Sequence, residues 1–256
     1  MTPAFISQLD ALGDAKIRLP VWWRDDDATR DGPALQRLLS MAEVSRVPVA
    51  LAVIPTGAQQ SLVDAIAKQP RVTVLQHGFA HINHTPRGHK PASELGDARP
   101  LAVVLAEVVE GQAMLRRQFG ETALRVLAAP WNQMSDRVAT ALPQTGIVGA
   151  SAFVDASLAG TYPGLAVANC HVDPIRWRDG AQFRGVEKSL AILCRQLNLR
   201  LAAADKGRIA EAEQPIGLLT HHRDMDEATW RFCHEFLQVL SSHRAVVPVS
   251  AREVFL

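Results

Sequence analysis

Short apolar runs alternate with longer amphipathic segments along the whole 256-residue chain, and this alternation is the feature that most constrains the fold. The apolar runs lie at residues 18–23, 47–55, 71–78, 123–130, 146–154, 164–172, 215–222 and 245–255. Amphipathic segments typical of helices occupy about 33–44, 58–68, 101–119, 183–204 and 226–243. Strands that are apolar on both faces must be buried on both faces, which predicts a parallel sheet covered by helices.

Seven or eight such strand and helix units in one chain are typical of a closed or nearly closed barrel. We therefore predict an α/β fold, a distorted (β/α) barrel of about seven parallel strands. Residues 85–100 are rich in Pro, Gly and charge and predict a long loop. No internal repeat or domain boundary is evident, so residues 1–256 are expected to form a single domain.

The composition argues against several classes of function. With 27 basic and 26 acidic residues the net charge is +1, so we expect neither a nucleic-acid nor a membrane partner. The N-terminal residues lack a basic region followed by an apolar stretch, which predicts a cytoplasmic protein. Cys170, Cys194 and Cys233 are widely spaced, so neither a disulfide framework nor a thiolate zinc site is expected. The oligomeric state is left open.

Polar and aromatic residues follow five of the expected strands. These strand ends read WWRDDDA, LQHGFAH, LAAPWNQ, CHVDPIRW and LLTHHRD. In a (β/α) barrel the carboxyl ends of the strands form one rim, and catalytic side chains gather there. The five segments are therefore expected to contribute to one site.

One of these ends carries three histidines within eight positions, His77, His81 and His84. A single strand-end histidine is more often a hydrogen-bonded residue than a metal ligand, and an aspartate triplet is more often a turn or a helix cap. A strand-end aspartate together with two histidines at i and i+4, however, is a ligand set that zinc or another first-row divalent ion accepts. Three protein ligands leave coordination positions open, as catalytic metal sites require. His84 is expected beside the ligands or facing the substrate at best.

The same residues resemble the polysaccharide deacetylases, the chitooligosaccharide deacetylase homology family of metal-dependent carbohydrate de-N-acetylases. The resemblance runs from about Arg18 to about Val249. In the first motif of that family, a strand ends in paired aspartates, and residues 24–28 (RDDDA) look like a variant of it. The second motif, His-x-x-x-His, matches residues 77–81, where Gly78 replaces the usual Ser or Thr. This form is more similar to divergent branches than to the secreted chitin and peptidoglycan enzymes.

The aspartate triplet can be aligned with the first motif in two registers. In one, Asp26 is the general base and Asp27 the metal ligand. In the other, Asp25 is the base and Asp26 the ligand. We favour the first register, because it places Ala28 where the family has glycine. The resemblance then implies that His77 and His81 complete a three-ligand metal site.

The other motifs are matched less closely. Ala129-Pro130-Trp131-Asn132 replaces the third motif, Arg-x-Pro-Tyr, so its arginine is missing. Trp131 is the expected wall of the acetyl pocket, and Asn132 is assigned with it to substrate binding.

The fourth and fifth motifs lie after the later strands. Asp173 and Trp177 are a loose counterpart of the fourth motif. Trp177 is assigned to substrate binding, and either it or Trp22 is expected to stack on a sugar ring or to pack in the core. In the fifth motif His221 aligns with the general acid, and His222 is assigned to substrate binding.

Together these features predict a metal-dependent hydrolase of C–N bonds other than peptide bonds, acting on an N-acetylated sugar or glycan precursor. One divalent ion, zinc in our expectation, would be held by Asp27, His77 and His81, with Asp26 or Asp25 and His221 as catalytic residues. The expected partner is a carbohydrate or another small molecule. The alternatives are a hydrolase of a non-sugar amide or ureide and a degenerate barrel that only binds. The missing arginine favours degeneration, whereas the intact carboxylates and histidines favour an enzyme.

Overall fold

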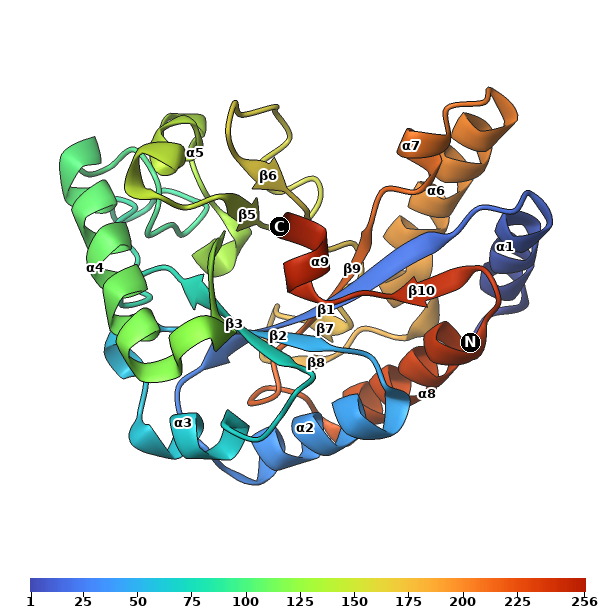
Figure 1. Ribbon diagram of the computed structural model, residues 1–256, viewed down its shortest axis with the longest axis horizontal. Helices are drawn as coiled ribbons and strands as arrows, with labels where there is room; N and C mark the ends of the chain where they lie inside the picture. The colour runs from blue at the N-terminus through green and yellow to red at the C-terminus, as the bar shows by residue number, and fades with distance from the viewer.

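The computed structural model describes all 256 residues, and eight of its strands form one sheet in which every pairing is parallel (Figure 1). These strands are β1 (Leu19–Ala28), β2 (Val49–Val53), β3 (Val72–His77), β4 (Ala123–Ala128), β5 (Gly149–Ser151), β6 (Ala166–Val167), β9 (Ile216–Thr220) and β10 (Val246–Pro248). Across the sheet, hydrogen-bonded neighbours follow the order β10-β1-β2-β3-β4-β5-β6. The remaining strand, β9, pairs with the other edge of β1.

The pairings of β1 show how the sheet closes. Its N-terminal half pairs with β10 and its C-terminal half with β2 on the same edge, while β9 occupies the other edge. Because β10 and β2 share one edge of β1, the eight strands occupy seven positions around the barrel. Isolated bridges from Phe153 to Cys170 and from Val172 to Leu218 link the β5–β6 side to β9. The prediction of a distorted barrel of about seven parallel strands is confirmed.

Helices cover the outside of this sheet, as burial on both faces requires. They are α1 (Pro3–Asp14), α2 (Pro33–Ser45), α3 (Gln60–Ile66), α4 (Leu101–Phe119), α5 (Asp136–Ala141), α6 (Val186–Asp205), α7 (Ile209–Ala212) and α8 (Glu227–Ser242). The last helix, α9 (Ala251–Phe255), packs on the inner side of the sheet instead. Helix α8 shows why they form: Asp226 caps its first turn by accepting from Thr229 N, and the helix buries Trp230, Cys233 and Leu237 along one stripe. No helix is both long and apolar enough to cross a membrane.

The core has an outer layer and an inner one because successive side chains of a strand point to opposite faces. A cluster of 42 buried residues, including Trp23, lies between the sheet and its helices. Trp22 points inward instead and meets Phe255 of α9, with ring centroids 5.5 Å apart. Figure 1 shows α9 across the middle of the ring of strands. The interior is therefore packed, and Trp22 belongs to the core.

Several local features differ from the expected elements. Helix α1 was not anticipated, and the expected terminal strand at 245–255 divides into β10 and α9, where Ser250 forms a capping box with Glu253. The expected strand at 164–172 is reduced to β6 and bridges. A small antiparallel hairpin, β7 (Ile175–Arg176) and β8 (Gln182–Phe183), precedes α6. A two-residue strand is too short to show a hydrophobic period, so the sequence pattern could not reveal this hairpin.

Candidate active site

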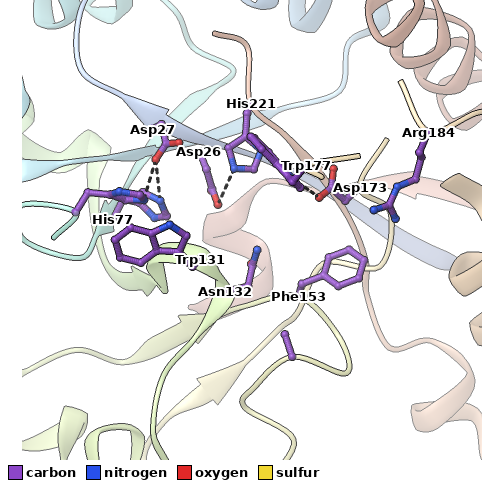
Figure 2. A pocket seen from close by; sticks show the side chains of 12 residues that line it. Asp26, Asp27, His77, Trp131, Asn132, Phe153, Asp173, Trp177, Arg184 and His221 are labelled. Atoms are coloured by element: carbon purple, nitrogen blue, oxygen red, sulfur yellow. Dashed lines mark hydrogen bonds and ion pairs between the residues drawn. The ribbon is translucent and has the colours of Figure 1, made fainter. Parts of the chain in front are cut away.

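A cavity of about 360 Å³ lies at the carboxyl ends of the strands and brings most of the candidate residues together (Figure 2). Eight of the ten candidates line it: Asp26, Asp27, His77, His81, Trp131, Asn132, Trp177 and His221. Asp25 and His222 do not. Phe153, Ala156, Asp173 and Arg184 complete the lining. His84 lines a separate surface hollow with the long loop after it.

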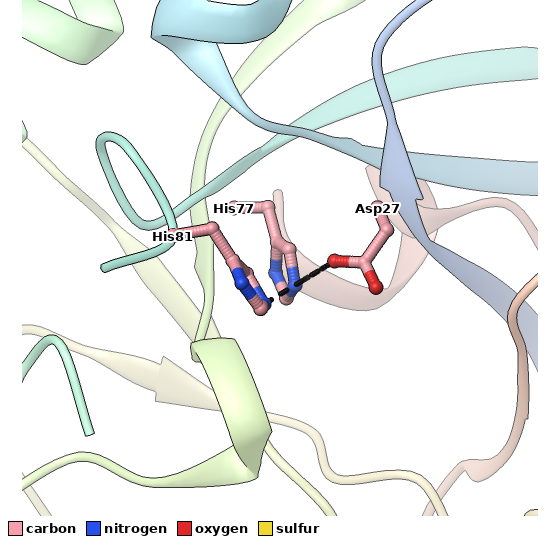
Figure 3. A group of neighbouring side chains, drawn as sticks. All are labelled: Asp27, His77 and His81. Atoms are coloured by element: carbon pink, nitrogen blue, oxygen red, sulfur yellow. Dashed lines mark ion pairs between the residues drawn. The ribbon is translucent and has the colours of Figure 1, made fainter. Parts of the chain in front are cut away.

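Three of these residues form a compact group of potential metal ligands (Figure 3). Asp27 Oδ1 lies 3.2 Å from His77 Nε2 and 3.3 Å from His81 Nε2. His77 is buried at the end of β3, while Asp27 and His81 are about one quarter exposed. The ligand atoms of all three lie within 4.8 Å of one another.

The chemistry of this group fits a divalent cation. His77 Nδ1 lies 3.1 Å from the carbonyl oxygen of Ala128, which can only accept, so in the neutral ring Nδ1 carries the proton and Nε2 turns its lone pair toward Asp27. Asp27 Oδ1 is buried and has no hydrogen-bond partner. Ligands of a tetrahedral zinc, at about 2.0–2.1 Å from the ion, are roughly 3.3 Å apart, close to the two separations between Asp27 and the histidines. These three residues could therefore hold a metal.

The charges of these three residues and of Asp26 act strongly on one another. Burial alone would raise the pKa of Asp27, but its contact with His77 and the nearby histidine charges lower that pKa well below its usual range. Burial and the charge of His77 lower the pKa of His81. Asp27 is thus an anion at neutral pH and His81 favours its neutral form, which are the states that metal ligands require. Burial would lower the pKa of His77, but the Asp26 and Asp27 carboxylates raise it, so metal binding at His77 would have to displace a proton.

Asp26 lies beside this group and is held by an arginine from its own strand. Arg24 Nε lies 2.9 Å from Asp26 Oδ1, and Arg24 Nη2 donates to Oδ2 at 3.0 Å. Residues i and i+2 of a strand share a face, so Arg24 lies inside the barrel below Asp26. Arg24 is fully buried and also donates to Ser151 Oγ and Asn132 Oδ1. A fixed guanidinium therefore orients the cavity carboxylate.

Asp25 points to the other face of β1 and makes a different pair. Its Oδ1 lies 2.5 Å from His222 Nδ1, and its Oδ2 accepts from Thr220 Oγ1 and from the His222 backbone N–H. Asp25 and His222 are both buried behind the cavity. The structure thus separates these two candidates from the eight that line the cavity, because the strand pleat turns adjacent side chains in opposite directions.

His221 faces the cavity from the end of β9. Its Nε2 lies 3.9 Å from Asp26 Oδ2, and its ring packs edge-on against Trp177 with centroids 4.6 Å apart. Trp177 is in turn fixed by a hydrogen bond from Nε1 to Asp173 Oδ2. A carboxylate and an imidazole thus stand on neighbouring sides of one space, which suits proton transfer in two directions.

Comparison with known proteins gives a fold. No family model matches the chain, and no curated protein matches its sequence. A proposed polysaccharide deacetylase of Mycobacterium smegmatis is 15% identical, with a TM-score of 0.64 over 93% of this chain and 89% of that one. A peptidoglycan deacetylase of Bacillus subtilis is 14% identical, with a TM-score of 0.56 over 94% and 91% of the two chains.

A third solved structure, a family 4 acetyl xylan esterase of Clostridium thermocellum in complex with a cobalt ion, is 11% identical, with a TM-score of 0.53 over 92% and 90% of the two chains. The chain has the polysaccharide deacetylase fold. All three likenesses extend over nine tenths of the chain, so the deacetylase fold accounts for the whole barrel.

Within this deacetylase fold, the turn after β4 forms a wall of the cavity. Trp131 is 37% exposed and packs on His81, with ring centroids 4.2 Å apart. Trp131 and Asn132 have φ angles of 51° and 56°. Of the nine non-glycine residues with positive φ, four line this cavity, since Asp27 and His81 share the feature. Such strain persists where surrounding contacts hold it, and it clusters at functional sites.

Two residues that hold the deacetylase-fold site were missed by the sequence analysis. Arg24 was noted only as a neighbour of the aspartates. Glu94 lies in the long loop and is 2% exposed, and its carboxylate accepts from the backbone N–H groups of Phe79, Ala80 and Ile82. It therefore fixes the turn that carries His81. The sequence gives no sign that Glu94 is buried, because charged residues in a Pro- and Gly-rich loop are usually exposed. For Arg24 there was a usable signal, since it lies two residues before Asp26 in a buried strand and therefore shares its face.

Proposed function

We propose that this protein is a metal-dependent hydrolase that removes the acetyl group from an N-acetylated sugar or glycan precursor. The observation that carries the proposal is the arrangement of Asp27, His77 and His81 at one cavity with Asp26 and His221. The chain combines the polysaccharide deacetylase fold with a ligand group and two proton-transfer groups in it. Membership of the deacetylase family and the choice of an amide of a carbohydrate are part of this proposal.

We assign the metal position to Asp27, His77 and His81 and propose one zinc ion. When bound, a divalent ion there would polarise the acetyl carbonyl and lower the pKa of a water molecule. The cobalt ion in the acetyl xylan esterase complex is consistent with a divalent metal on this fold. Three protein ligands leave room for substrate and water.

Asp26 is proposed as the general base. Its carboxylate takes a proton from the attacking water, whose oxygen forms a bond to the acetyl carbon. Arg24 contacts both carboxylate oxygens and so fixes the direction in which Asp26 can accept that proton. The segment that replaces the third motif, residues 129–132, has no arginine. In this site Arg24, from β1, supplies a guanidinium instead. The missing arginine is therefore no argument for a degenerate barrel.

His221 is proposed as the general acid. It gives a proton to the amide nitrogen while the C–N bond breaks, so acetate and a free amine leave. Asp25 receives no part in the proton transfers in this proposal, and His222 none in substrate contact, because both lie behind the cavity. Trp131 and Trp177 form apolar walls on two sides of the reacting group, suited to a methyl group and a sugar ring.

The test combines metal content with acetate release. Purified protein loaded with zinc or cobalt is assayed on a panel of N-acetylated sugars and small amides, with Asp26→Asn and Asp27→Asn alongside. Asp26→Asn is expected to keep about one ion per chain and to lose roughly 10²–10⁴-fold in kcat. Asp27→Asn is expected to lose the ion.

Asp31→Asn is the matched control, because Asp31 lies outside the cavity, two residues before the start of α2. It should behave as the wild type in both measurements. Wild-type protein that carries the metal but releases acetate from none of the sugars would contradict de-N-acetylation. Release of another product from a small amide would instead support the hydrolase of non-sugar amides.

A further inference from the structure

The cavity holds a positive charge that the proposed reaction does not use. Arg184, directly after β8, lines the cavity. Figure 2 shows its guanidinium across the cavity from Asp27 and His77, beyond His221 and Trp177. The acetyl group must lie beside the metal ligands to react. The charge of Arg184 is therefore placed for a different part of the substrate.

Arg184 differs from every other arginine that is buried or half-buried, because its guanidinium has no protein partner. Arg24 pairs with Asp26, and the other three buried or half-buried arginines also have protein partners. Arg71 pairs with Glu43, Arg99 with Glu107, and Arg200 donates to backbone carbonyls. A guanidinium that lines a cavity and forms no hydrogen bond or ion pair there keeps its N–H donors free for an anionic ligand.

The neighbouring carboxylate does not meet this need. Asp173 lies on the same side of the cavity, but its Oδ1 accepts from Ile175 N at 2.9 Å and its Oδ2 from Trp177 Nε1 at 3.0 Å. It forms no ion pair with Arg184 within 4.0 Å. Asp173 thus positions Trp177, and the donors of Arg184 remain available.

Of the arginines in the hairpin region that carries Arg184, only Arg184 lines the cavity. Residues 174–185 contain Arg176, Arg178 and Arg184 but only one acidic residue, Asp179. The Arg178 side chain is 89% exposed. Arg178 is therefore a solvent-exposed arginine of the same hairpin that lies outside the cavity.

We infer that Arg184 forms a subsite for an oxyanion, a phosphate or a carboxylate, that the substrate carries apart from its reacting amide. This inference rests on the proposed function for the reaction itself. The planar guanidinium presents paired N–H donors that match both kinds of oxyanion. Trp177 stands between the reaction centre and Arg184, where a sugar ring can pack on it. The substrate class is accordingly an acidic N-acetylated sugar rather than a neutral oligosaccharide.

The experiment compares three substrates of similar size: the methyl glycoside of N-acetylglucosamine, N-acetylglucosamine 1-phosphate and N-acetylmuramic acid. Wild type, Arg184→Gln and Arg178→Gln are assayed for acetate release after metal loading. The wild type is expected to favour at least one acidic substrate at least tenfold in kcat/KM. Arg184→Gln should reduce this preference by roughly ten- to hundredfold, the usual effect of losing hydrogen bonds to a charged group. Arg178→Gln, from the same hairpin but outside the cavity, should retain it.

The outcomes separate the two proposals. A preference for the phosphate or for the carboxylate identifies the source of the oxyanion. Equal turnover of all three compounds by the wild type, or equal loss on all three in Arg184→Gln, overturns the subsite while leaving the deacetylase proposal intact. If the wild type releases acetate from none of them, de-N-acetylation fails for this class. Equilibrium binding of the three compounds to metal-free protein then tests the subsite. Tighter binding of an acidic compound that is lost in Arg184→Gln supports it, and equal binding of all three compounds by the wild type overturns it.

Discussion

At the scale of single residues, the site depends on side chains that hold the proposed catalytic and metal-binding residues in place. Arg24 is fully buried, contacts both oxygens of Asp26 and also holds Ser151 and Asn132. Burial would lower the pKa of this arginine, but Asp26 reverses the effect and raises it. Such a pair is costly to break, because removal of one partner leaves a buried charge uncompensated.

Replacement of Arg24 is therefore expected to affect both stability and catalysis. Arg24→Gln should lower the free energy of unfolding by about 3–5 kcal/mol and reduce kcat about a hundredfold while the bound metal is retained. Arg24→Lys should recover part of kcat, since lysine keeps the charge but lacks the two-pronged geometry. Unfolding in urea and steady-state kinetics measure the two effects. A variant with unchanged kcat per folded, metal-loaded molecule would contradict the positioning role.

Glu94 supports the proposed metal ligands in the same way. Its carboxylate binds three backbone N–H groups of the turn between His77 and His81. Gly78 in this turn has a φ of 59°, and a Cβ there would overlap the carboxylate and lie 2.6 Å from Pro130 Cγ. Only glycine allows the approach of Glu94 to the turn.

The expected consequence is a loss of metal affinity when this support is removed. Glu94→Gln replaces a carboxylate oxygen by an amide NH₂ that cannot accept from the turn, and zinc should bind about 10- to 100-fold more weakly. Competition with a chelating dye measures the affinity. Glu110→Gln, on the exposed face of α4, is the control and should bind zinc as the wild type does. Equal affinities in the two variants would rule out the supporting role.

At the scale of elements, strand β1 serves two purposes through its two faces. The inward face carries Arg24 and Asp26 to the cavity, and the outward face carries Asp25 to His222 on the segment after β9. The strand register shifts between Asp25 and Ala28, and Asp27 has a φ of 68° there. This irregularity interrupts the alternation of side chains, and Asp27 faces the two histidines. A single strand end therefore supplies the proposed base, the proposed metal ligand and a tie to the neighbouring strand.

The tie between Asp25 and His222 should make stability depend on pH. Burial would lower the pKa of His222, but the charge of Asp25 outweighs it, so the folded-state pKa is raised above the ordinary 6.5. The stabilisation is then fully present below pH 6.5 and is lost as the pH rises through the folded-state pKa. In metal-free protein, the difference in free energy of unfolding between wild type and His222→Gln should be larger at pH 6 than at pH 9. A difference independent of pH would contradict the ion pair.

At the scale of the whole molecule, the proposed metal joins strands that are distant in sequence. Asp27 is the last residue but one of β1, while His77 ends β3 and His81 lies in the turn that follows. A ligand that binds only the folded state stabilises it by about 2.7 kcal/mol at a concentration one hundred times its Kd. Zinc should therefore raise the Tm of the wild type by several degrees. His81→Ala should show no such rise, and a zinc-dependent Tm that survives in His81→Ala would place the ion elsewhere.

The architecture and much of the site could be read from the sequence. The repeated apolar runs demanded strands buried on both faces, and parallel strands need helices to cover them. Because all their carboxyl ends meet at one rim, the residues at those ends had to lie together, and Asp26, Asp27, His77, His81 and His221 do so. Periodicity and strand-end position are local properties, so local sequence was sufficient for them.

Other features were decided only by the tertiary structure. The pleat of β1 determined that Asp26 faces the cavity and Asp25 faces His222, which the triplet itself left open. Burial determined that Arg24 lies beside Asp26, the proposed base, and that Glu94 supports the turn that carries His81. Arg184 entered the cavity through a hairpin too short to have a sequence pattern. Each depends on contacts between segments far apart in the chain, and such contacts arise only when the barrel has closed.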